Sequence, residues 1–355
     1  MRLLRILACS LLLLTSCATE PTRVSGPAEE LGELSGAPYA VEIPTDWNGD
    51  LVLVMHGYEP IGVPRKNPDP NDEASPLFLA KGYAVAASRY SAQGWAVREA
   101  IADNEALLHH FSAKYGKPKH TYLVGSSMGG LVALASLERL PKSYSGALSL
   151  CGVNASASTA FQDSVITSLV SFDYFFPGII PELDDAGAKA VADRDAIERA
   201  LASNENVAKL LTDRLDVPRD GLASHINLNY FVLKQTQAKF GGFPVDNRAV
   251  VYRGFGDDVR FNSGVKRYAG NPKSVMELNA SASLSGNISK PVVLRLSQHD
   301  QTIPARLSSA YLEQVQRSGK SRYLTVLPPA GEGHCGFSPL EIEQSFDKLI
   351  QAESR

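Results

Sequence analysis

The stretch TYLVGSSMGGLVAL, residues 121–134, joins a short apolar run to a run with helical spacing. Residues 122–124 are typical of a buried strand, and the apolar residues from Leu131 onward recur as they do along one face of a helix. A chain that passes from strand to helix through glycines turns sharply at that point. This junction favours a fold in which strands and helices alternate.

The same junction holds a candidate nucleophile. Gly125 and Gly129 place Ser127 at the centre of a G-x-S-x-G pattern, which cannot be centred on Ser126. A serine on a strained strand-to-helix turn needs neighbours without side chains, so that the chain can pass closely. Its hydroxyl then lies near the first free N–H groups of the helix, which stabilise a developing negative charge. The alternative is a serine that caps a helix in a glycine-rich loop.

Short apolar strands alternate with helices on both sides of a long middle section, a pattern typical of a parallel sheet covered by helices. We therefore expect an α/β fold, a mostly parallel twisted sheet with helices on both faces, formed by residues 37–152 and 290–355. Residues 153–289 are expected to form an inserted helical cap over the carboxyl ends of the strands, with a helical part at 184–215 and a loop-rich stretch from there to about residue 289. The expected strands are 39–43, 50–56, 83–88, 122–124, 147–151, 292–296 and 323–327, and helices are expected at 97–116, 304–317 and 339–350.

Charge and motifs exclude several classes of function. The chain of 355 residues carries a formal charge of -3 and has no basic runs, which argues against nucleic-acid binding. It contains no H-E-x-x-H metal motif, no phosphate loop and no dinucleotide fingerprint, so neither a metal nor a cofactor is expected. These features leave the oligomeric state open.

Residues 1–17 have the features of an export signal. Arg2 and Arg5 form a positively charged start, and the apolar core from Ile6 to Leu14 is too short to span a bilayer as a permanent helix. The protein is therefore expected to leave the cytoplasm.

The end of this signal, LTSC at residues 14–17, resembles a bacterial lipoprotein box. The resemblance implies that Cys17 is lipidated and anchors the protein in the cell envelope, in the periplasm or at the outer membrane, with membrane contact through the lipid alone. The alternative is an ordinary secretory signal cut nearby, for instance after Ala18, and a secreted protein. Residues 18–36, rich in Pro, Gly, Glu, Ser and Thr, are expected to form a flexible tether.

A serine nucleophile needs a base within hydrogen-bonding reach and an acid that orients the base. Asp300 follows the strand expected at 292–296, in SQHDQTIP, and His334 follows the last expected strand, in PPAGEGHCGFSP. Both lie in loops after strands, and both follow Ser127 in the chain. We predict that Ser127, Asp300 and His334 form a catalytic triad.

Other acids and bases are weaker candidates. Asp257 and Asp258, in GFGDDVRF, are rivals to Asp300, but they lie in the middle section and are expected to form a loop turn or a helix cap. Structural roles are expected for the remaining histidines, His56, His109, His110, His120, His225 and His299.

The run LVLVMHGY supplies a strand that leads into His56, Gly57 and Tyr58. Together with the nucleophile pattern and the order Ser, Asp, His, it makes the chain from about residue 37 to residue 350 resemble the α/β-hydrolase superfamily. The resemblance implies an acyl-enzyme formed on the serine and released by water. It also implies that the backbone N–H groups of Tyr58 and Met128 form an oxyanion hole, while His56 holds the loop.

Two further segments, WNGDLVLVMHGY and GYAVAASRYSAQGW, resemble secreted bacterial hydrolases. Feruloyl and tannase-type esterases share a cysteine directly after the catalytic histidine, as Cys335 is here, but they also have a cysteine before the nucleophile, where this chain has Ser126. Cys151 and Cys335 either form a disulfide or remain two buried thiols. A disulfide requires the loop of His334 to lean across one intervening strand.

These observations favour an exported serine hydrolase that acts on small carboxylic esters. A peptidase or amidase of the same fold is the alternative, with Glu182, Asp184 or Asp185 holding the substrate's amine. A third possibility is a surface lipoprotein that binds a ligand with a vestigial site. The aromatic residues at 172–176 are expected either to line an apolar pocket or to form the cap's own core.

Overall fold

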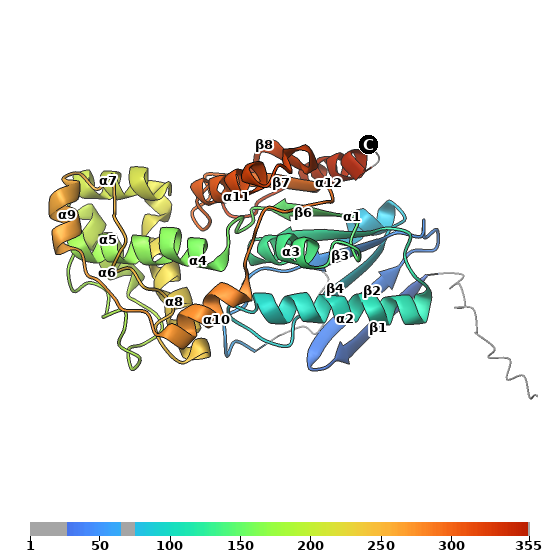
Figure 1. Ribbon diagram of the computed structural model, residues 1–355, viewed down its shortest axis with the longest axis horizontal. Coiled ribbons are helices and arrows are strands. Elements are labelled where there is room, and N and C mark those ends of the chain that lie inside the picture. The colour runs from blue at the N-terminus through green and yellow to red at the C-terminus, as the bar shows by residue number, and fades with distance from the viewer. Residues whose placement is uncertain (1–26, 65–74, 354–355) are drawn as a thin grey trace, which may run out of the picture.

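The computed structural model describes residues 27–64 and 75–353. One sheet of eight strands has the order β1-β2-β4-β3-β5-β6-β7-β8 (Figure 1). From β4 to β8 all neighbours are parallel, whereas β1 and β2 are antiparallel to the strands they pair with. The strands are β1 (Ala28–Leu34), β2 (Ala37–Ile43), β3 (Leu51–Met55), β4 (Ala84–Ser88), β5 (Thr121–Ser126), β6 (Gly146–Leu150), β7 (Val292–Gln298) and β8 (Leu324–Glu332).

Helices cover both faces of this sheet, as the sequence predicted, and alternate strand residues face each layer. On β3, Leu51 and Leu53 face the layer of α2 and α3, while Val52 and Val54 face the layer of α1 and α12. Both faces are therefore apolar, which explains why the strands appear in the sequence as unbroken apolar runs. The helices of the two layers are α1 (Ser75–Ala80), α2 (Val97–Tyr115), α3 (Met128–Arg139), α11 (Arg306–Arg317) and α12 (Pro339–Glu353).

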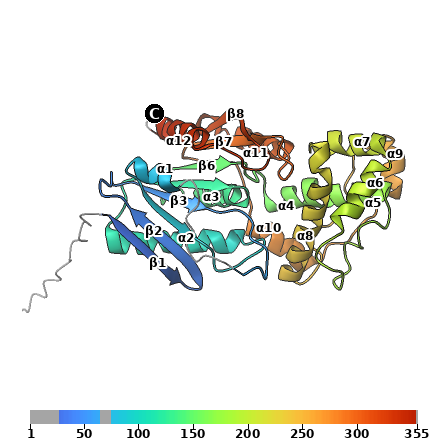
Figure 2. The same cartoon turned by 180° about the vertical axis from the view of Figure 1, so that it is seen from behind.

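The chain between β6 and β7 is helical and gathers at one end of the sheet, beyond the carboxyl ends of the strands (Figures 1 and 2). We call this section the cap. Its core is continuous with that of the α2 and α3 layer. Its helices are α4 (Ala157–Ala160), the π-helix η1 (Phe161–Ile166), α5 (Thr167–Phe175), α6 (Arg194–Ala202), α7 (Glu205–Leu215), the short 3-10 helix η2 (Arg219–Gly221), α8 (Leu222–Phe240), α9 (Asp258–Gly264) and α10 (Pro272–Ser281).

The expectation of a loop-rich stretch after residue 215 is wrong, because α8 is a 19-residue helix within it. Apolar residues such as Ile226 and Tyr230 are buried along α8, but so are polar residues such as His225 and Gln235. Buried polar side chains interrupt the apolar periodicity by which a helix is identified.

The flexible tether expected at 18–36 is also wrong from Ala28 onward, where β1 pairs along its whole length with β2. Ser35 and Gly36, both at positive φ, form the two-residue turn between the strands. β1 is an edge strand with four exposed residues, so its sequence lacks the apolar alternation of a buried strand. Residues 18–26, like the signal at 1–17 and the predicted lipid site Cys17, lie outside the described residues. Within the described part, no helix has the length and apolar character needed to cross a membrane.

Glu30 ties this edge strand to α2. Its carboxylate accepts hydrogen bonds from Tyr39 (2.9 Å) and Tyr115 and pairs with Lys114 (2.8 Å) and His110 (3.3 Å). Burial raises the pKa of Glu30, but these hydrogen bonds outweigh it and lower the pKa from 4.5 to about 2. A carboxylate whose pKa is lower in the folded protein than in the unfolded chain stabilises the fold at pH values above the unfolded pKa. This stabilisation is lost as the pH falls towards the pKa of the folded protein.

We expect Glu30→Gln to lower the Tm at pH 7 by roughly one to three degrees, because it removes charge-assisted bonds. The difference from the unmodified protein should shrink between pH 4.5 and pH 2, where Glu30 itself becomes protonated. Thermal unfolding followed by circular dichroism across this range measures both effects. The neighbouring Glu29, exposed on the same strand, provides a matched control in Glu29→Gln. An equal loss from both variants would contradict the assignment to Glu30.

Candidate active site

Ser127 stands on the turn between β5 and α3, with φ 56° and ψ -125°. A Cβ atom on Gly125 would lie 2.1 Å from the carbonyl oxygen of Gly129, and one on Gly129 would lie 2.0 Å from that of Met55. No side chain fits at either position. The glycines of the G-x-S-x-G pattern thus let β3, β5 and α3 meet closely enough to hold Ser127 in a conformation that non-glycine residues rarely adopt.

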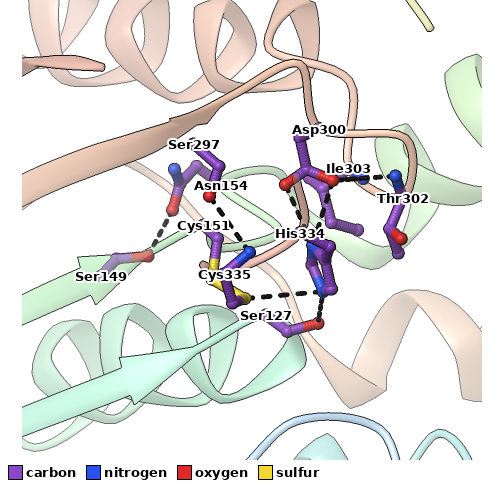
Figure 3. The surroundings of a disulfide bond; sticks show 10 residues. All are labelled: Ser127, Ser149, Cys151, Asn154, Ser297, Asp300, Thr302, Ile303, His334 and Cys335. Atoms are coloured by element: carbon purple, nitrogen blue, oxygen red, sulfur yellow. Dashed lines mark hydrogen bonds and ion pairs between the residues drawn. A yellow bond between two sulfur atoms is a disulfide. The ribbon is translucent and has the colours of Figure 1, made fainter. Parts of the chain in front are cut away.

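The structure brings Ser127, Asp300 and His334 together, although they come from three separate loops (Figure 3). The Ser127 hydroxyl lies 2.9 Å from Nε2 of His334, and Nδ1 of the same ring lies 2.9 Å from Oδ2 of Asp300. The backbone N–H groups of Thr302 (2.8 Å) and Ile303 (2.9 Å) donate to Oδ1 of Asp300. Because these bonds fix the carboxylate of Asp300, it favours the tautomer of His334 in which Nδ1 carries the proton. Nε2 of His334 is then free to accept the proton of Ser127.

The loop after β3 lies close to the nucleophile, Ser127. A Cβ atom on Gly57 would lie 3.2 Å from Cβ of Ser127. Tyr58 and Met128 both border the same cavity as Ser127, and Met128 is the first residue of α3. This arrangement is compatible with the predicted oxyanion hole, whose two donors remain a prediction.

His56 lies at the base of this loop, and its contacts fit the structural role expected of it. Its ring stacks on that of Tyr90 at a centroid distance of 3.9 Å, and Nδ1 lies 2.8 Å from the carbonyl oxygen of Gly57. The hydroxyl of Tyr90 donates to the carbonyl of His56 (3.1 Å). Burial lowers the pKa of His56 and so favours the neutral ring.

The nucleophile turn of this site lies in a region that matches a known protein family. The family model described as "Putative esterase" matches residues 54–205, which contain the loop after β3, the nucleophile turn and the first part of the cap. The chain has the α/β-hydrolase fold. The match supports a hydrolase of the esterase kind. No curated protein is similar to it in sequence.

Several solved structures share the α/β-hydrolase fold with this chain. A prolyl endopeptidase structure has a TM-score of 0.50 at 14% identity, over 93% of this chain and 39% of that one. An esterase from Pyrococcus furiosus has a TM-score of 0.48 at 14% identity, over 94% and 96% of the two chains. The esterase Est1E from Butyrivibrio proteoclasticus has a TM-score of 0.45 at 12% identity, over 92% and 99%. At these identities the likeness concerns the fold alone.

The cap reaches the loop after β3 through Gln235, a residue that the sequence did not single out. Oε1 of Gln235 accepts hydrogen bonds from the Tyr58 hydroxyl (2.6 Å) and from the backbone N–H of Ile61 (3.0 Å), while Nε2 donates to the carbonyl of Ile61 (3.3 Å). α8 therefore fixes the backbone that carries the predicted oxyanion donor. No sequence pattern marks a lone glutamine for such a role.

The structure pairs Cys151 with Cys335 as a disulfide, with the two Cα atoms 5.3 Å apart. Cys151 follows β6 and Cys335 follows His334, and β7 lies between β6 and β8 in the sheet. The loop of His334 therefore leans across one strand, as the disulfide alternative required. The backbone N–H of Cys335 also donates to Oγ of Ser297 on β7 (3.1 Å). These contacts anchor the loop directly beside His334.

The rival acids and histidines have other partners. Asp257 caps α9 by accepting from the N–H of Arg260 (3.1 Å), and Asp258 accepts from the N–H of Phe255 (2.9 Å). His299 is exposed, and its Nδ1 lies 2.9 Å from a carboxylate oxygen of Glu332. The other histidines contact acids or buried polar groups: His109 with Glu105, His110 with Glu30, His120 with Asp50, and His225 with Ser168 and Asn229.

A cavity of about 90 Å³ opens beside Ser127. The residues that line it are uncharged and mostly apolar. The aromatic residues at 172–176 are not among them; Phe172 contacts Phe176, and Tyr174 and Phe175 contact Phe261 within the cap. The run is therefore part of the cap's own core. The cavity is lined by Tyr58, Trp95, Ser127, Met128, Val153, Ala160, Phe161, Ser164, Val165, Leu228, Asn229, Val232, Thr302, Ile303 and Leu307.

Asp300→Asn should lower kcat by roughly a thousand-fold or more, because an amide that donates towards Nδ1 of His334 selects the wrong tautomer of the ring. The measurement is steady-state hydrolysis of p-nitrophenyl butyrate. Asp257→Asn is the matched control and should be mild, since Asp257 caps a helix of the cap. A severe loss in Asp257→Asn with a mild one in Asp300→Asn would reject the assignment of the acid.

Proposed function

We propose that the chain hydrolyses carboxylic esters with Ser127 as nucleophile, His334 as base and Asp300 as the residue that orients the base. The observation that carries the proposal is the continuous line of hydrogen bonds from Ser127 Oγ through both nitrogens of His334 to Asp300, next to an apolar cavity. A vestigial site that only binds a ligand would not need the side chains of Ser127, His334 and Asp300 to be hydrogen-bonded to one another.

The geometry supports the following sequence of steps. Oγ of Ser127 attacks the ester carbonyl as its proton passes to Nε2 of His334, and the negative charge forms on the carbonyl oxygen beside the N–H groups of Tyr58 and Met128. The C–O bond to the alcohol then breaks, and His334 returns the proton to the leaving alkoxide. Water repeats the two steps on the acyl-enzyme, which releases the acid and restores the serine.

The cavity favours esters over peptides with a free amine. No Asp or Glu lines it. Glu182, one proposed anchor for an amine, already pairs with Lys266 (2.5 Å), and Asp185 accepts the N–H of Gly187 (2.8 Å) in an exposed turn. A buried ammonium group would need a carboxylate partner that this cavity does not offer.

Ser127→Ala should reduce hydrolysis of p-nitrophenyl butyrate by several orders of magnitude, because it removes the attacking oxygen. Ser126→Ala, one residue before on the same turn, should have a far smaller effect, since the G-x-S-x-G frame excludes it. Labelling with a fluorophosphonate probe and peptide mapping identifies the reactive serine independently. A label on Ser126, or equal losses in both variants, would show that the register is wrong.

We also propose that the enzyme is exported and held to the bacterial envelope by a lipid on Cys17, a residue outside the described range. Cys17→Ala should move the protein from the membrane fraction to the soluble fraction of an expressing bacterium, with its esterase activity unchanged. Unchanged fractionation, together with a mature N-terminus other than residue 17, would reject lipidation.

A further inference from the structure

The cavity beside Ser127 is built largely by the cap. Ala160, Phe161, Ser164 and Val165 line it from two successive turns at the start of the cap, and α8 supplies a second wall. Residues 161–166 form a π-helix, a rare conformation that is frequently found at functional sites. The side chains of this short segment thus set the shape of the space next to the nucleophile.

One side of the cavity is rigid. Phe161 meets Trp95 edge to face at a centroid distance of 5.0 Å, and Nε1 of Trp95 donates to Oγ of Ser281 (2.8 Å). Both aromatic rings are almost fully buried. Because neither ring can turn without breaking this packing, the wall sets a limit on the length of any group that enters.

The position of the base indicates which half of an ester the cavity takes. His334 must give its proton to the leaving alcohol, so the alcohol lies on the side of Ser127 that faces His334. His334 is not among the residues that line the cavity, whereas both predicted oxyanion donors, Tyr58 and Met128, are. The group that enters the cavity is therefore the acyl group that becomes attached to Ser127.

The volume of the cavity and the charge of its lining limit which acyl groups can enter. The cavity volume of about 90 Å³ is several times the roughly 10–15 Å³ that one water molecule needs. Because a methylene group is about as large as a water molecule, the cavity has room for an acyl chain of about four to eight carbons. The lining carries no charged side chain. A carboxylate placed there would lose its hydration without gaining a partner.

We propose that this cavity is an acyl-binding site that selects neutral, aliphatic acyl groups of about four to eight carbons, with Ala160 and Val232 setting the accepted length. The inference rests on the proposed ester hydrolysis. Ala160 on the π-helical side and Val232 on α8 are apolar positions where a change of one side chain alters the depth available without adding charge.

The test measures kcat/KM for p-nitrophenyl acetate, butyrate, hexanoate, octanoate and palmitate, with p-nitrophenyl hemisuccinate as a charged four-carbon acyl group. Butyrate and hexanoate should exceed both acetate and palmitate, and butyrate should exceed hemisuccinate by about a hundred-fold or more because of the buried charge. Ala160→Leu should lower the ratio of hexanoate to acetate by about ten-fold or more, and Val232→Ala should raise the ratio of octanoate to butyrate. Ala202→Leu, an exposed alanine on α6, is the matched control and should change neither ratio.

Three results would overturn the inference. If hemisuccinate reacts as well as butyrate, the acyl group is not buried in an uncharged site. If both ratios stay unchanged in Ala160→Leu and Val232→Ala while Ser127→Ala abolishes turnover, ester hydrolysis stands but the acyl group binds elsewhere. If the folded, unmodified protein cleaves none of these esters, the proposed function fails and the inference fails with it.

Discussion

The close approach of three backbone segments at the end of β5 is the constraint on which the site depends. Gly125 and Gly129 allow β5, α3 and the end of β3 to meet where any side chain would collide. The approach fixes Ser127 in its strained conformation and brings the loop at Gly57 against it. Strain of this kind persists only where the surroundings determine the backbone fully, and here the buried strands β3 and β5 do so.

The cap contributes to the site in two ways, and α8 takes part in both. Leu228 and Val232 border the cavity, and Gln235, one turn further along, holds the loop of Tyr58. A single helix thus connects the cavity proposed to hold the acyl group with the backbone expected to stabilise the negative charge. Substrate-binding groups and charge-stabilising groups held by one element keep their relative positions, which is the condition for catalysis by positioning.

The sequence predicted the parts of the fold that depend on local patterns. The strands and the turn at Ser127 follow from apolar runs and glycine spacing, and the loops of Asp300 and His334 follow from strand order. It missed β1, an exposed edge strand that pairs with β2 and is tied to α2 through Glu30, and α8, whose buried polar side chains hide its helical period. Gln235 and the cavity could not be predicted, because both arise where distant segments meet.

The disulfide would keep the protein in one covalent piece if the main chain were cut within the cap. Cys151 and Cys335 are separated by 184 positions in the chain, and nearly all of the cap lies between them. A protease that cut one peptide bond between residues 151 and 300 would leave Ser127 on one fragment and Asp300 and His334 on the other. The two fragments would stay covalently joined next to His334, so a cut in the cap would not separate the serine from its base.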